Sequence, residues 1–317
     1  MHSDMILRRP LQRLPLACHT VTSKPYWPII NVKLSTEYRG QRKMKLNELL
    51  ASEMALPSIP KVIALLLNEL DQDEPDLRKV SQLINTDPVL TARLLQLANS
   101  AQFQLSNKIG GVSEALALMG LMQVRSLATA AAIAGAFRSI SGVELPVFWQ
   151  YSLDVAKLSR TLAGMVRQNQ QVAFTAGLVH AVGELVMHVG LAGPMAGLNA
   201  DVALLSLKRA KAETEAYGFC YAEVGAGFAR RWQFPPRIIE ALEHQCQPFE
   251  KDGYEPLAGL LHLASWRVRA RAADYDQGEL ADRFPDVVAL ALGLDIDMVL
   301  QQNPIEWTTR IEVAAFL

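Results

Sequence analysis

The stretch LINTDPVLTARLLQLANSAQF, residues 83–103, shows most clearly which kind of secondary structure this chain forms. Asp87 directly precedes Pro88, and this pair is typical of a helix N-cap followed by a first turn, where the N–H that proline lacks is not needed. Three leucines follow at intervals of four and three residues, on one face of a helix: Leu90, Leu94 and Leu97. Asn99 and Ser100 are expected to end this helix.

The same helical periodicity continues over nearly all of the chain from Met44 onward. One apolar stripe with Pro60 in its first turn comprises Ile59, Val62, Ile63, Leu66 and Leu70. After Gly120, residues 121–137 are rich in alanine and carry only Arg125 as a charge, which predicts a helix deep in a bundle. Further apolar stripes lie within residues 155–165, 171–189, 224–232, 238–242 and 257–268. Alternation typical of a strand is missing, so we predict an all-α fold.

Composition limits the class of protein. The chain has 317 residues, of which 50% are hydrophobic and 20% charged, and its formal net charge is −1. These values exclude a wholly disordered, collagen-like or disulfide-knot chain, and they give no overall attraction to nucleic acid or to acidic membranes. Cys18, Cys220 and Cys246 are too few and too far apart in sequence for a disulfide framework or a close metal-ligand pair. We therefore expect a cytoplasmic protein.

The first 43 residues differ from the rest. They hold eight Lys or Arg and two acidic residues, so their charge is +6 and that of the remainder is −7. Their prolines are irregularly placed and no helical period is visible, which favours a disordered basic tail over an arm that binds nucleic acid or a membrane surface. Met44 opens the periodic sequence and is an alternative translation start.

The most apolar region, residues 172–198, is expected to form a buried helical hairpin and not to insert into a membrane. A spanning helix needs about 20 uninterrupted apolar residues. This region instead contains polar and helix-breaking residues: His180, Glu184, His188, Gly190, Gly193 and Pro194. The first three follow one another at intervals of four, so in principle they can hold a metal on one helix face. We favour the interpretation that they are hydrogen-bonded side chains of a helical core, because metal ligands usually come from more than one element.

Motifs in six segments resemble the HDOD domain. They read LPSIP at 56–60, LINTDPVLTARLLQLANSAQF at 83–103, EALALMGLMQVRSLA at 114–128, FWQYSLDVA at 148–156, FTAGLVHAVGEL at 174–185 and AEVGAGFARRWQFPPRIIEAL at 222–242. The positions matching the family's structural motifs are Pro57, Pro60, Asp87, Pro88, Leu94, Asn99, Ser100, Gly120, Gly177, Gly183, Gly225, Trp232 and Pro235.

The resemblance covers residues 52–250 and implies two helical subdomains, 52–145 and an HD-like part at 146–250. Residues 251–317 are then a C-terminal helical extension, and residues 1–43 remain the tail. HDOD domains belong to the HD superfamily, whose active members are metal-dependent phosphohydrolases, including cyclic di-GMP phosphodiesterases. Most HDOD domains lack the metal ligands.

The catalytic HD pattern can be carried onto this chain position by position. Tyr151 stands where an active relative has its first histidine, and His180 is followed by Ala181 at the histidine–aspartate pair that names the superfamily. Tyr221 occupies the next ligand position, the double histidine reads His244–Gln245, and the late aspartate reads Ser265. Only two of these positions keep a ligand type, and the loss of the bridging carboxylate matters most because hard metals need anionic oxygens. The resemblance therefore implies no catalytic residues, no bound metal and no cofactor.

The two tyrosines have a second consequence. Phenol rings at these positions can close the former metal cavity by ring packing and by hydrogen bonds to His180 or His244. We therefore expect a closed, structural pocket, in which Tyr221→His alone does not restore metal binding.

Taken together, these features predict a non-catalytic regulatory module of a bacterial-type signalling pathway that acts by binding a partner protein. Candidate contact regions are residues 99–107, the charged segment 270–283 and the C-terminal helices to Leu317. The alternative is a residual metal-dependent phosphohydrolase or a metal-free protein that binds a cyclic nucleotide. Four arginines are the candidate phosphate ligands for it: Arg125, Arg160, Arg230 and Arg231.

Overall fold

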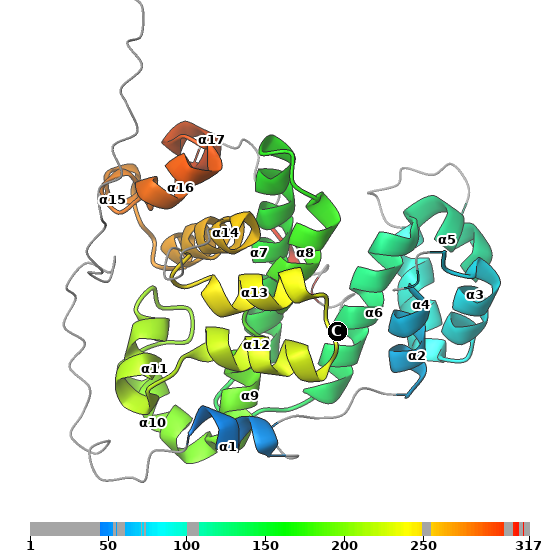
Figure 1. Cartoon of the computed structure of the whole chain (residues 1–317), viewed down its shortest axis with the longest axis horizontal. Helices are drawn as coiled ribbons and strands as arrows, with labels where there is room; N and C mark the ends of the chain where they lie inside the picture. Colours follow the sequence, from blue (N-terminus) through cyan, green and yellow to red (C-terminus); the bar gives the residue numbers. More distant parts are fainter. Residues whose placement is uncertain are drawn as a thin grey trace, which may run out of the picture. The chain divides into compact units, whose positions relative to one another are not determined.

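Every secondary-structure element in the described part of the chain is a helix, which confirms the all-α prediction (Figure 1). The computed structural model describes residues 45–52, 55, 61–70, 72, 74–99, 108–248, 255–300, 307–310 and 313, all within one unit of the chain, Val32–Leu317. The predicted tail, the alternative start at Met44, and Pro57, Pro60 and Ser100 lie outside these residues.

The helices of the first half pack in sequence-adjacent groups. Their bounds are α1 Leu46–Ala51, α2 Lys61–Leu70, α3 Leu77–Asn85, α4 Pro88–Ala98, α5 Val112–Met119 and α6 Leu121–Ala136. Helix α2 packs on α3 and α6, and α4 packs on α5. Helix α6, the predicted alanine-rich helix, continues the packing onto α8 of the second half.

The second half is built around the 21-residue helix α7. Its helices are α7 Leu145–Met165, α8 Gln170–Val179, α9 Val182–Gly190, α10 Ala192–Asp201, α11 Arg209–Tyr217, α12 Tyr221–Arg231, α13 Pro236–His244, α14 Pro256–Ala272, α15 Gln277–Asp282, α16 Asp286–Leu292 and α17 Ile296–Leu300. Helix α7 packs on α8 and α14, and α12 packs on α9 and α13. Helix α14 therefore joins the core of the HD-like part, although it belongs to the predicted extension; the domain boundaries themselves stay a prediction.

Local chemistry fixes the ends of α4. The Asp87 carboxylate accepts hydrogen bonds from the backbone N–H groups of Val89 and Leu90, at 2.9 and 3.0 Å. Such a cap is typically worth about 1 kcal/mol. At the other end Asn99 is the C-cap, and its side chain both donates to and accepts from the backbone of Ile109, at 2.8 and 2.7 Å. Leu94 between them is fully buried in the core.

Two glycines allow the central helices to cross closely. A Cβ atom at Gly177 on α8 would lie 2.7 Å from the Cα atom of Ala156 on α7. A Cβ atom at Gly183 on α9 would lie only 2.0 Å from the carbonyl oxygen of Tyr221 and 2.7 Å from the nitrogen of Gly225, both on α12. Any side chain at Gly183 would thus collide with backbone, which explains why α9 needs glycine where it meets α12.

The apolar helical stripe at residues 171–189 is interrupted at His180 and Ala181, which form a turn between α8 and α9. Gln245 explains the break, because its side-chain amide donates to the His180 carbonyl oxygen at 2.9 Å and inserts into the helical ladder. Taken together, Gln170–Gly190 is long and apolar enough to cross a membrane, but 83% of its most apolar window is buried inside the protein. That burial is typical of a core helix; the cytoplasmic location stays a prediction.

Candidate functional site

Five of the seven positions that the HD pattern assigns lie in one cluster of buried residues. Tyr151 comes from α7, His180 from the α8–α9 break, and Tyr221 from the first turn of α12. The rings of Tyr151 and His180 meet edge to face, with centroids 4.8 Å apart. Gln245 reaches the same place through its bond to the His180 carbonyl, and Ala181 follows His180 in the turn.

The two remaining positions lie farther along the chain's helices. His244 is the last residue of α13 and is half-buried. Ser265 on α14 is buried, and its hydroxyl donates to the carbonyl oxygen of His262 at 3.1 Å. Neither His244 nor Ser265 is a hydrogen-bond partner of the two tyrosines, and His180 contacts Tyr151 only through its ring. The expected hydrogen bonds from the tyrosines to His180 or His244 are therefore not formed.

Arg269 lies at the centre of this cluster of buried residues, and sequence reasoning missed it. Its Nε–H donates to the Tyr151 hydroxyl at 2.8 Å. Its guanidinium carbon lies 5.5 Å from the ring centroid of Tyr151 and 5.1 Å from that of Tyr221, and the residue is only 5% exposed. We call the group formed by Tyr151, His180, Tyr221, Gln245, Cys246 and Arg269 the guanidinium pocket. The signal was available, since Arg269 lies one helical turn after Ser265 and so shares its face of α14.

The protonation states in the guanidinium pocket follow from burial and from this one cation. Burial and, less strongly, the Arg269 charge lower the pKa of His180 to about 3, although the hydrogen bond to the Gly177 carbonyl opposes this shift. Burial raises the pKa of Tyr151 to about 12, although the Arg269 guanidinium opposes the rise. Burial disfavours the charge of Arg269 itself, but Tyr151, Tyr221 and other neighbours outweigh it and raise its pKa. At neutral pH the Arg269 cation therefore lies among one neutral imidazole and two neutral phenols.

The tautomer of His180 can be read from its contacts. Its Nδ1 lies 2.6 Å from the carbonyl oxygen of Gly177, which can only accept, so Nδ1 carries the proton and Nε2 presents a lone pair. That Nε2 atom, Oε1 of Gln245 and Nη2 of Arg269 are buried without a hydrogen-bond partner in the protein. One donor and two acceptors thus remain unsatisfied in this pocket.

The donor set does not fit the metal centre that active HD relatives hold. Hard divalent metals need carboxylate oxygens, and the assigned positions supply two imidazoles, two neutral phenols, an amide and a hydroxyl but no carboxylate. A dication about 5 Å from a guanidinium is repelled by about 7 kcal/mol at an effective dielectric constant of about 20. Nowhere in the described residues do three His, Cys, Asp or Glu side chains gather closely enough to hold a metal ion.

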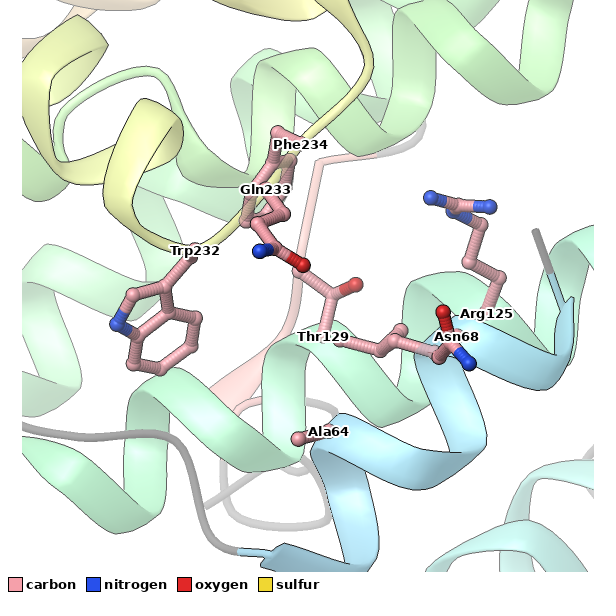
Figure 2. A pocket seen from close by; sticks show the side chains of 8 residues that line it. Ala64, Asn68, Arg125, Thr129, Trp232, Gln233 and Phe234 are labelled. Atoms are coloured by element: carbon pink, nitrogen blue, oxygen red, sulfur yellow. The ribbon is translucent and has the colours of Figure 1, made fainter.

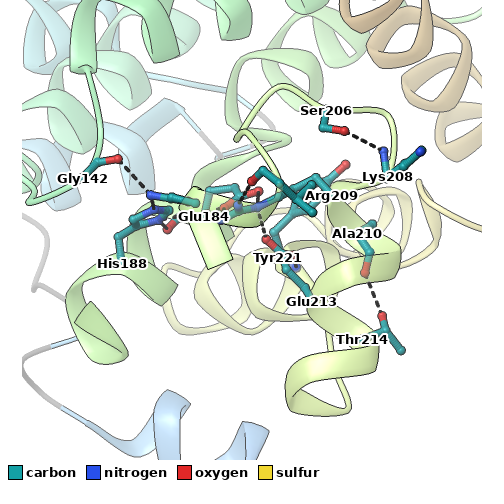
Figure 3. Close-up of polar contacts among 12 residues, drawn as sticks. Gly142, Glu184, His188, Ser206, Lys208, Arg209, Ala210, Glu213, Thr214 and Tyr221 are labelled. Carbon is teal, nitrogen blue, oxygen red and sulfur yellow. Dashed lines mark hydrogen bonds and ion pairs between the residues drawn. The ribbon is translucent and has the colours of Figure 1, made fainter. Parts of the chain in front are cut away.

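A second buried cluster adjoins the guanidinium pocket and involves Glu184, Arg209 and Glu213 (Figure 3). Arg209 donates from Nε and Nη2 to the two Glu184 oxygens, each at 3.1 Å, and from Nε to Glu213 at 2.7 Å. Burial opposes the charge on Arg209, but the two carboxylates outweigh it and raise its pKa. Burial, followed by the neighbouring Glu184 charge, raises the pKa of Glu213 well above its ordinary value. We call these three residues the Arg209 cluster.

The Arg209 cluster shows how the three residues spaced by four in the sequence are used. Glu184 is held by Arg209, and His188 places Nδ1 2.7 Å from the Glu184 carbonyl oxygen and Nε2 3.0 Å from the Asn199 amide. His180 belongs to the guanidinium pocket instead. The side chains thus engage separate partners and do not converge on one point.

The arginines that were candidate phosphate ligands do not form one site. Arg125 lines a groove of about 70 Å³ together with Ala64, Leu67, Asn68, Thr129, Trp232, Gln233 and Phe234 (Figure 2). Arg160 lies over the ring of Phe174 at 5.4 Å, and Arg230 pairs with Glu243. Pockets for small molecules usually enclose about 300 to 1,000 Å³, so this groove is too small for a nucleotide.

Comparisons with known proteins agree with the fold. The sequence profile of the HDOD domain family matches residues 56–248. A protein of Shewanella amazonensis SB2B described as a candidate phosphohydrolase is 28% identical, with a TM-score of 0.71 over 85% of this chain and 98% of that one. An HDOD domain protein of unknown function from Geobacter sulfurreducens is 22% identical, with a TM-score of 0.70 over 86% and 98%.

A third solved structure and the curated sequences add context. A Marinobacter aquaeolei VT8 protein described as a candidate signal transduction protein is 20% identical, with a TM-score of 0.66 over 88% of this chain and 62% of that one. The chain spans less than half the length of the curated relatives that it matches in sequence.

Proposed function

We propose that this chain, which belongs to the HDOD domain family and so is a signalling module of the HD superfamily, regulates a signalling pathway by binding a partner protein. On this proposal it performs no hydrolysis itself. The observation that carries the proposal is Arg269. A buried guanidinium, bonded to Tyr151 and stacked on Tyr221, occupies the pocket to which the HD pattern assigns the metals.

The substitutions around Arg269 support one another. Ala181 stands at the position of the bridging carboxylate, so no anion is available there to compensate a metal. Tyr151 and Tyr221 supply ring faces that attract a cation without carrying a charge. A guanidinium held between two phenols thus supplies the positive charge that a metal would supply. The pocket then has neither the anionic ligands nor the space for a metal to activate a water molecule.

Partner binding is the remaining way for such a module to act. The segment 270–283, predicted as a contact region, ends α14 and includes α15, and most of its residues are exposed. Of the other predicted regions, residues 100–107 and most of the C-terminal end lie outside the described residues.

Calorimetric titration of the full chain with Mn²⁺, and separately with cyclic di-GMP, tests the non-catalytic part. The proposal expects no saturable binding of either. Saturable Mn²⁺ binding that His180→Ala abolishes would contradict it. Saturable binding of the nucleotide without metal would favour the alternative of a metal-free nucleotide-binding protein.

The partner-binding part needs its own test. Once a partner has been captured from the native host by the full chain, its dissociation constant is measured for Asp282→Lys and for Glu240→Lys. Both residues are exposed acids, but only Asp282 lies in segment 270–283. Weakening by Asp282→Lys alone is expected, and equal effects of the two variants would exclude this segment as the contact region.

A further inference from the structure

Two thiols meet at the edge of the guanidinium pocket. Cys220 is the N-cap of α12 and is buried, with 6% of its surface exposed, whereas Cys246 follows α13 and is half-buried. Helices α12 and α13 are joined by residues 232–235 and pack against each other, so Cys220, just before α12, and Cys246, just after α13, lie at the same end of this helix pair, where each thiol shifts the pKa of the other. The Cys246 sulfur also lies 3.5 Å from the Tyr221 hydroxyl. These two cysteines, 26 residues apart, are therefore side by side in the fold.

Their surroundings make the two thiols chemically different. The neighbouring Cys220 thiol lowers the pKa of Cys246, and the Tyr221 hydroxyl and the Arg269 charge lower it further against the effect of burial. The Cys246 thiol, together with burial, raises the pKa of Cys220. Cys246 is thus the better nucleophile, and Cys220 is its protonated neighbour.

We propose that Cys220 and Cys246 form a reversible regulatory disulfide, with hydrogen peroxide as the oxidant. The Cys246 thiolate attacks one peroxide oxygen, which breaks the O–O bond and, with one proton, releases water and leaves a sulfenic acid. The Cys220 sulfur then attacks the Cys246 sulfur, and its proton leaves with the hydroxyl as a second water. Two thiols and one peroxide give one disulfide and two waters. A thiol reductant reverses the step.

The bond would change the guanidinium pocket directly. Cys246 directly follows Gln245, whose side-chain amide donates to the His180 carbonyl oxygen. The backbone carbonyl oxygen of Gln245 lies 2.8 Å from Nδ1 of His262. Drawing the Cys246 sulfur toward Cys220 removes it from the Tyr221 hydroxyl and pulls on this connection to the α8–α9 break. The inference does not depend on the proposed partner binding, because it concerns an input to the fold. In a reducing compartment such a bond would be transient, as redox-sensing disulfides are.

Peptide mapping of the native full chain tests the proposal. The chain is reduced, freed of reductant, treated with hydrogen peroxide, blocked with an alkylating agent and digested with trypsin without reduction. We expect a disulfide between the tryptic peptide of residues 212–230, which contains Cys220, and that of residues 238–251, which contains Cys246. The mass of the intact chain should fall by about 2 Da, and reduction should restore both thiols. Linkage only after denaturation, linkage to Cys18, or irreversible oxidation of Cys246 beside a free Cys220 would each overturn it.

Single substitutions separate the roles of the two thiols. Cys220→Ser is expected to leave a Cys246 sulfenic acid that dimedone traps, and Cys246→Ser to leave Cys220 unreacted under the same treatment. The opposite pattern would overturn the assignment of Cys246 as the attacking thiol. The mapping of the unsubstituted chain stands on its own if either variant fails to fold.

Discussion

Lowering the pH should destabilise the protein through His180. This histidine is neutral and buried, with a pKa of about 3 against an ordinary value of 6.5. Below about pH 6.5 the His180 imidazole therefore binds a proton in the unfolded chain, whereas in the folded chain it stays neutral until about pH 3. The free energy of unfolding falls as the pH drops through this range. At 1.4 kcal/mol per pH unit, the loss between pH 7 and pH 4 is about 3 kcal/mol.

The assay compares urea unfolding of the natural chain with that of His180→Gln at pH 7, 5 and 4. Other titrating groups, Glu213 and His262 among them, remain in both proteins, so their contributions cancel in the difference. His244→Gln, which removes a half-buried histidine outside the pocket, is the matched control. We expect the stability advantage of the natural chain over His180→Gln to shrink by about 3 kcal/mol on acidification. Parallel curves, within about 1 kcal/mol, would refute the assignment of a buried neutral histidine.

Three further predictions follow from the core. Arg209→Met leaves two buried carboxyl groups without a counter-charge and should lower the free energy of unfolding by about 3–5 kcal/mol. The control Arg231→Met, at an exposed arginine, should change it by less than about 0.5 kcal/mol. Equal effects of the two variants in urea titrations would contradict this prediction. Gly183→Ala places a Cβ atom 2.0 Å from a carbonyl oxygen and should lower the free energy of unfolding by about 3 kcal/mol or prevent folding. The control is Gly193→Ala, whose Cβ atom meets nothing within 4 Å. Similar melting temperatures for the two variants would show that α9 can shift. Tyr221→His should bind no metal, and an anomalous-scattering peak in its pocket after a manganese soak would show otherwise.

Local sequence chemistry was sufficient to predict helix α4. The Asp87–Pro88 pair and the leucine spacing after it depend only on nearby residues, and α4 begins at Pro88. The break at His180 was not predictable in this way, because its cause is Gln245, which lies 65 residues away in sequence. Periodicity alone carries no information about a distant side chain that inserts into a helix.

The candidate site was predictable only as a set of substitutions. Tyr151, His180 and Tyr221 follow from the HD pattern, and the structure places them around one pocket. Arg269 was missed because no position of that pattern corresponds to it and because an arginine in a helix is usually a surface residue with its charge in water. The Cys220–Cys246 contact was missed for a related reason, since sequence separation concealed two residues that the packing of α12 on α13 brings together.

The most direct test of the account is elemental metal analysis of the purified full chain, combined with hydrolysis assays on cyclic dinucleotides and on a generic phosphodiester in the same sample. The account predicts metal well below one equivalent per chain and no turnover above that of His180→Ala. Stoichiometric iron, manganese or zinc, with turnover that His180→Ala abolishes, would contradict it and would mean that Arg269 does not keep metals out of this pocket.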